Sequence, residues 1–161
     1  MTENKEKHDL MVSKFIDYLE NEKITNYSVE FPIPTDKINP DFVDVVVFNW
    51  DKMFLFEIKS GSANFSDNIQ QMRKYIFLLR KVPRYKWRDI SGFLVFNSSF
   101  KDNVIKFKSL FKDVDILILD KDNNSIVELN SNKELKKIIK SIGKINKIRK
   151  ILSILTEEDR F

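Results

Sequence analysis

The chain contains no cysteine, a single histidine and only three glycines among its 161 residues. The absence of cysteine excludes disulfide bonds, thiol catalysis and zinc-thiolate sites, and it agrees with a reducing compartment. A hydrophobic content of 42%, a charged content of 32% and fourteen phenylalanines argue against disorder and against a repeat architecture. We therefore expect one domain over residues 1–161, large enough to bury a core.

Long hydrophobic runs are also missing. Residues 1–6 lack the apolar core of a signal peptide, and no run approaches the length of a membrane span. The expected location is the cytoplasm, and no membrane partner is expected.

Two short apolar runs, residues 42–48 and 53–59, are rich in β-branched and aromatic side chains and flank the polar residues 49–52. This pattern predicts a β-hairpin. With the turn centred between Trp50 and Asp51, paired residue numbers sum to 101, which puts Asp44 opposite Glu57. Because strand side chains alternate between two faces, Lys59 shares their face. The other face is expected to be uninterrupted core, formed by Val43, Val45, Val47, Phe54, Phe56 and Ile58.

Two carboxylates about 4 Å apart repel each other by roughly 1 to 4 kcal/mol, so Asp44 and Glu57 need a positive partner. Oxygen ligands suit Mg²⁺ or Mn²⁺, which one or two carboxylates hold together with water and substrate phosphate oxygens. Lys59 would then position an attacking water and offset charge in the transition state. The plainer interpretation is a solvent-facing ion pair, but an aspartate between valines and a glutamate in a phenylalanine run are unusual places for solvated charges.

The pattern of Asp44 and Glu57-Ile58-Lys59 resembles the PD-(D/E)xK nuclease superfamily, also called the restriction-endonuclease-like fold. The resemblance implies that Asp44 and Glu57 hold the catalytic metal, that the Ile58 carbonyl adds a ligand, and that Lys59 assists the water. Asp41 follows Pro40 and competes with Asp44 for the first role. The predicted register puts Asp41 on the core side, but a slip or a bulge would reverse the choice, since no Asn-Gly or Asp-Gly turn pins the hairpin.

A second resemblance, to RecB-type members of the superfamily, lies in the Gln-x-x-x-Tyr pattern of Gln71 and Tyr75. These residues are one helical turn apart and project on one side. The resemblance implies that Gln71 approaches the site and that Tyr75 supports it, with Gln70 as the substitute. The plainer interpretation is a solvated helix flank.

RecB-type enzymes usually offer an upstream metal-binding histidine, and the only histidine here is His8. Other members place a glutamate on the first helix, so Glu20, Glu6 and Asp9 are alternatives. Spacing does not choose among them.

Periodicity and capping signals predict helices over about 7–23, 67–81 and 100–111 and strands over 27–33, 42–48, 53–59, 90–97 and 115–119. The resulting order, α-β-β-β-α-β-α-β, is that of an α/β restriction-endonuclease-like core, a mixed sheet flanked by helices, over about residues 7–120. Residues 131–156 form a helical extension that begins with a capping box.

Basic charge is concentrated in that extension: residues 131–155 carry a net charge of +7, against +4 for the whole chain. A second concentration lies in residues 73–88, where aromatic residues alternate with basic ones. These regions predict contact with nucleic acid backbones, although a solvated helix face explains the extension equally well. The residues expected to make these contacts are Arg73, Lys74, Lys136, Lys140 and Lys144.

The expected function is therefore a Mg²⁺- or Mn²⁺-dependent nuclease acting on DNA. Two alternatives stay open: a catalytically inactive nucleic-acid-binding or assembly protein with the same fold, and a nuclease directed at RNA. The isoleucine-rich extension also leaves open a homodimer.

Overall fold

The computed structural model describes residues 2–35, 37–49, 51–60, 64–106, 114–120, 125–128, 151–152 and 154. The predicted extension over residues 131–156, with Lys136, Lys140 and Lys144, lies almost entirely outside these residues. Within the described ranges, none of the helices combines the length and the apolar character needed to cross a bilayer.

The chain folds into one mixed six-stranded sheet in the order β1-β2-β3-β4-β5-β6. The strands are β1 (Tyr27–Ile33), β2 (Asp41–Phe48), β3 (Lys52–Lys59), β4 (Asp89–Asn97), β5 (Asp115–Asp120) and β6 (Ser125–Glu128). The pairs β3/β4 and β4/β5 are parallel, and the other three pairs are antiparallel. Helix α2 (Phe65–Arg80) joins β3 to β4, as a parallel pair requires a crossover connection.

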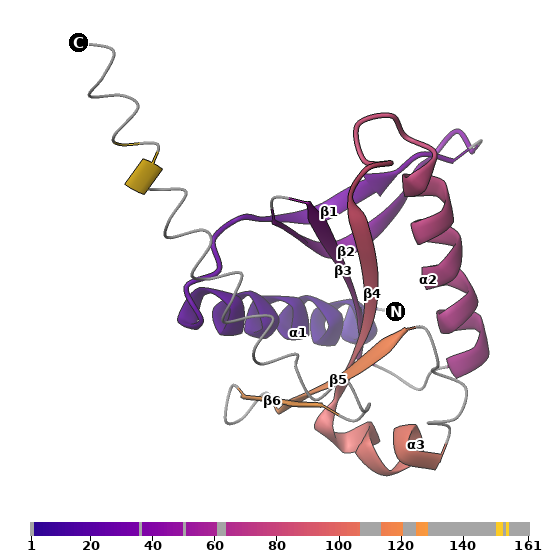
Figure 1. Cartoon of the computed structure of the whole chain (residues 1–161). Helices are drawn as coiled ribbons and strands as arrows, with labels where there is room; N and C mark the ends of the chain where they lie inside the picture. Colours follow the sequence, from indigo (N-terminus) through magenta and orange to yellow (C-terminus); the bar gives the residue numbers. More distant parts are fainter. Residues whose placement is uncertain are drawn as a thin grey trace.

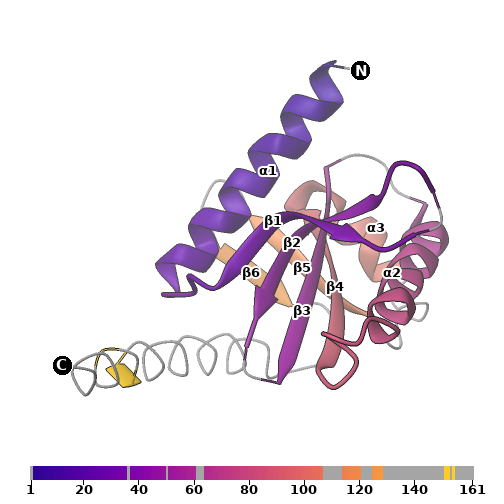
Figure 2. The same ribbon diagram turned by 90° about the horizontal axis from the view of Figure 1, so that it is seen from above.

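Two long helices cover opposite faces of this sheet (Figures 1 and 2). Helix α1 (Thr2–Asn21) packs on one face through Met11, Phe15 and Leu19, whereas α2 packs on the other through Ile69, Met72 and Leu79. Each helix is amphipathic and buries one stripe, so the sheet lies between two apolar layers. We call these layers the α1-side core and the α2-side core. The α/β class with a mixed sheet flanked by helices is confirmed.

The remaining elements are short. A 3₁₀ turn η1 (Ser98–Phe100) leads into α3 (Lys101–Lys106), which is the described part of the helix predicted over 100–111. Strand β6 was not predicted. It is only four residues long and pairs with β5, so it depends on a partner strand more than on its own sequence.

The central hairpin has the predicted register. Val45 pairs with Phe56, Val46 with Leu55 and Phe48 with Met53, so all paired numbers sum to 101. Asn49 and Lys52 close the turn with two backbone hydrogen bonds of 2.9 and 3.2 Å.

The predicted alternation of faces is wrong at the start of β2. Val45 and Val47 lie in the α1-side core as expected, but Val43 lies in the α2-side core. The reversal coincides with Glu30 on β1, the residue that would pair with Asp44: it has a φ of 52°, and the ladder skips this pair. A positive φ in a strand acts as a local break in the pleat and changes which side the next residues face.

Candidate active site

The predicted carboxylates meet where β2 and β3 part. The ladder between these strands ends at the Val45 and Phe56 pair, and beyond it side chains replace the backbone partners. The Asp44 N–H donates to Glu57 Oε1 at 3.0 Å, and the Ile58 N–H donates to Asp44 Oδ2 at 2.8 Å. Each acid therefore accepts a hydrogen bond from the backbone of the other strand, and this fixes the two carboxylates relative to each other.

Glu57 is a buried charge with few compensating contacts. Its side chain belongs to a residue only 6% exposed, and its Oε2 lies 3.5 Å from Lys59 Nζ. Burial and the nearby charge of Asp44 raise the pKa of Glu57 to about 7, against the opposing attraction of Lys59. A carboxyl with a raised pKa beside a second carboxylate is a common sign of a functional site.

His8 joins the site from the other side of the sheet. Helix α1 places its Nε2 3.1 Å from Asp44 Oδ2, and this hydrogen bond raises the pKa of His8 even though burial lowers it. Its Nδ1 lies 3.7 Å from Asp9 Oδ1. The structure thus brings the single histidine, which sequence spacing could not select, to the predicted aspartate.

Glu20, the alternative upstream acid, is not part of this cluster. It accepts a hydrogen bond of 2.7 Å from the Tyr27 hydroxyl. Residues 8 and 20 are twelve positions apart on one helix, about 18 Å at a rise of 1.5 Å per residue. Glu20 therefore provides a carboxylate that is remote from the site.

Helix α2 carries the other two predicted site residues, Gln71 and Tyr75. Tyr75 is 2% exposed and is hydrogen bonded with Gln71. Its pKa is raised, first by burial and then by the charges of Glu57, Asp41 and Asp44. Gln71 is half-buried whereas Gln70 is exposed, so Gln71 lies on the inner side of the helix. Asn64 caps this helix by accepting from the Asp67 N–H at 3.2 Å.

The predicted register puts Asp41 on the face of Val43, and in the structure Val43 lies in the α2-side core rather than with Val45 and Val47. After burial and the charge of Glu57, the charge of Asp41 is a further cause of the raised pKa of Tyr75 on α2. Asp41 Oδ2 lies 3.7 Å from Nζ of the exposed Lys37, and Asp41 itself is half-buried. Asp44 is the acid that the geometry joins to Glu57.

The carboxylate oxygens of Asp44 and Glu57 suit a hard cation that is also bound by water and by substrate oxygens. Within the described ranges, no three His, Asp or Glu side chains are grouped so as to hold a metal ion by themselves. Mg²⁺ does not require such a cage, because it keeps several waters and uses one or two carboxylates plus substrate oxygens. The N–H and the C=O of a strand residue point toward the same neighbouring strand. Because the Ile58 N–H points toward Asp44 on β2, the Ile58 carbonyl also points toward β2.

The basic residues predicted to contact nucleic acid are described only in part. Arg73 and Lys74 are exposed on α2, one and two residues beyond the buried Met72. Trp87 is 60% exposed and the Arg88 guanidinium lies 5.1 Å from the centre of its ring, so this tryptophan is a surface cation-π partner rather than core.

Comparison with known proteins defines the fold. No family model and no curated protein sequence matches the chain. Among solved structures, the chain is similar to an XisH family protein from Nostoc punctiforme, with a TM-score of 0.53, 15% identity, and coverage of 74% of this chain and 97% of that one. A FdxN element excision controlling factor protein from Anabaena variabilis gives a TM-score of 0.45 and 16% identity, with coverage of 70% and 97%.

At such low identity the likeness concerns the fold alone. The chemistry must therefore be argued from the residues of this chain.

Proposed function

We propose that the protein is a metal-dependent nuclease that hydrolyses phosphodiester bonds in DNA. One observation carries the proposal: Asp44 and Glu57, on two strands that part, share a hydrogen-bonded site with His8 and Lys59. The buried carboxylate of Glu57 beside the partly buried Asp44 costs stability unless a cation binds there, and this cost points to a functional role.

Asp44, Glu57 and the Ile58 carbonyl would hold Mg²⁺ or Mn²⁺, which supplies positive charge beside the scissile phosphate when bound. Asp44 is oriented for this task by two donors, the Ile58 N–H and His8. Orientation of a ligand by a second residue typically changes metal affinity or activity by roughly 10- to 100-fold.

Lys59 and Gln71 act on the attacking water. The Lys59 ammonium lies beside Glu57 and can donate to a water or to the charge that develops on the phosphate. Gln71 is half-buried on α2 and is held by its hydrogen bond with Tyr75, and in this proposal it orients the water. Arg73 and Lys74, exposed on the same helix, would contact the nucleic acid backbone.

The test is a cleavage assay with Mg²⁺, Mn²⁺ or chelator on single-stranded, duplex and branched DNA and on RNA. Glu57→Gln should lower cleavage by on the order of 100-fold or more, while binding to DNA persists, since it removes a charge that acts in the transition state. Glu20→Gln is the matched control, because it changes a carboxylate at the remote end of α1 and should leave cleavage unchanged.

If Glu57→Gln cleaves as fast as the unchanged protein, the proposed site is wrong. If DNA binds but no substrate is cleaved under any condition, the alternative of an inactive binding protein on this fold replaces the nuclease. Cleavage of RNA alone would change the substrate and leave the site intact.

A further inference from the structure

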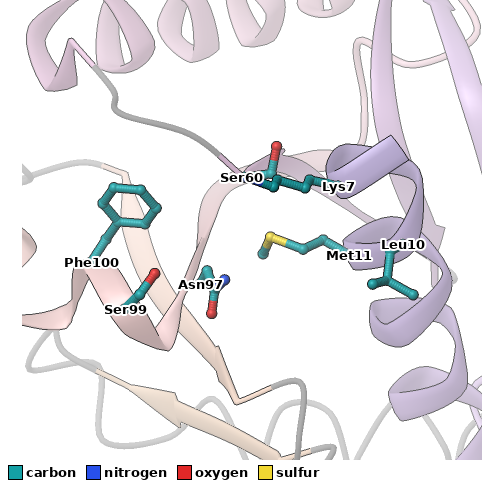
Figure 3. A pocket seen from close by; sticks show the side chains of 7 residues that line it. All are labelled: Lys7, Leu10, Met11, Ser60, Asn97, Ser99 and Phe100. Atoms are coloured by element: carbon teal, nitrogen blue, oxygen red, sulfur yellow. The ribbon is translucent and has the colours of Figure 1, made fainter. Parts of the chain in front are cut away.

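A cavity of about 250 Å³ lies between α1 and the ends of β3 and β4. Figure 3 shows its lining side chains, which come from α1, from the ends of β3 and β4, and from η1. The lining residues are Lys7, Leu10, Met11, Ser60, Asn97, Ser99 and Phe100.

The cavity is adjacent to the catalytic residues along the chain. Lys7 precedes His8 and Ser60 follows Lys59, so two lining residues have Cα atoms about 3.8 Å from those of site residues. Strands β3 and β4 are parallel, with Lys59 paired to Phe96, so both end at this cavity. Ligands of open α/β sheets bind outside the carboxyl ends of such strands.

The lining combines apolar side chains with a few hydrogen-bonding groups. Leu10, Met11 and Phe100 provide apolar surface, whereas Asn97 and the two serines provide donors and acceptors. Lys7 is the one charged residue among the described lining, and no carboxylate is present there to repel a phosphate. A cavity below the roughly 300 to 1,000 Å³ of a drug-sized site suits a single ring system.

We infer that this cavity holds one unpaired nucleobase of the substrate strand, next to the phosphate that is cleaved. The base stacks on Phe100, Asn97 hydrogen bonds with its edge, and Lys7 contacts an adjacent phosphate. Bases inside a duplex cannot reach such a pocket, so the substrate is single-stranded or locally unpaired nucleic acid. The inference rests on the proposed function, from which it takes the class of substrate.

The test measures binding in a Glu57→Gln background, so that cleavage does not interfere. The probe is a short oligodeoxynucleotide containing 2-aminopurine, whose fluorescence falls on stacking, presented either single-stranded or in a duplex. We expect the single strand to bind at least about tenfold more tightly than the duplex and to lose fluorescence on binding. An abasic residue in place of the fluorescent base should weaken binding about tenfold, as expected for one lost base stack.

Two variants assign the effect to the cavity. Phe100→Ala should weaken single-strand binding about tenfold, and Asn97→Leu, which keeps the branched shape but removes the amide, should weaken it several-fold. Phe100 also packs against the α2-side core, so a thermal melt accompanies its variant, and Asn97→Leu provides the second test if Phe100→Ala does not fold. The matched control is Phe77→Ala, because Phe77 is 58% exposed on α2 and does not line the cavity.

The outcomes separate this inference from the proposed function. Unchanged binding in both cavity variants, or equal binding of the abasic strand, would overturn the base pocket even if Glu57-dependent cleavage is found. Weakened binding in both variants supports the pocket even if no substrate is cleaved.

Discussion

Glu57→Gln should make the protein more stable at alkaline pH. The substitution keeps the size of the side chain and removes a negative charge that is buried, 6% exposed, and close to Asp44. In the folded protein the pKa of Glu57 is raised from 4.5 to about 7. Between these values the folded state binds more protons than the unfolded state, so the free energy of unfolding falls as pH rises.

The size of the effect follows from the same values. At about 1.36 kcal/mol per pKa unit, the rise from 4.5 to about 7 corresponds to about 3 kcal/mol of stability, present below pH 4.5 and lost above pH 7. For a chain of this length this is on the order of 10 °C in melting temperature. The raised pKa of His8 acts in the same direction, and its largest cause, the hydrogen bond to Asp44, is kept in the variant although the contribution of the Glu57 charge is lost.

The measurement is thermal or urea unfolding at pH 5 and pH 8 in chelator, followed by the same melts with Mn²⁺. The Glu57→Gln variant should be the more stable protein at pH 8, and Mn²⁺ should raise the stability of the unchanged protein alone, because a ligand that binds only the folded state stabilises it. Glu20→Gln, which changes an exposed carboxylate, should follow the unchanged protein. Parallel pH profiles for the Glu57→Gln variant and the unchanged protein would refute the reasoning.

Three further predictions concern other parts of the structure. His8→Ala removes the side-chain partner of Asp44 and should lower metal-dependent cleavage by about 10- to 100-fold in the same assay; an unchanged rate would show that His8 does not position the aspartate. Gly92→Ala should cost about 1 to 3 kcal/mol in urea unfolding, since its Cβ would lie 2.5 Å from Met72 Cγ, and Met72→Ala should restore part of the loss. Phe15→Ala should cost about 3 to 5 kcal/mol, because Phe15 is fully buried; a loss below about 1 kcal/mol would mean that α1 is not docked as described.

Local sequence was sufficient for most of the fold. Alternation and turn position predicted the hairpin register, because shifting it by one residue would move every valine and phenylalanine to the opposite face. Asn64, an asparagine directly before α2, caps that helix through its side chain, as this residue type commonly does. The same local rules placed Asp44, Glu57 and Lys59 on neighbouring strands, and helical spacing placed Gln71 beside Tyr75.

Contacts between distant residues were decided only by the tertiary structure. His8 reaches Asp44 across 36 positions because α1 docks against the sheet through Phe15 and Leu19, and no periodicity in the sequence records that docking. The pleat breaks beside Glu30, whose φ is positive, and Val43 lies in the α2-side core, which a regular strand pattern does not predict.

What the sequence by itself determined is the order of the elements up to β5, the hairpin register and the acids on it, because these depend on neighbours close along the chain. What only the tertiary structure decided is which upstream residue completes the site, where the pleat breaks, and that a cavity opens between α1 and the ends of β3 and β4. These features arise from packing between elements, whose energies depend on contacts that no short stretch of sequence contains.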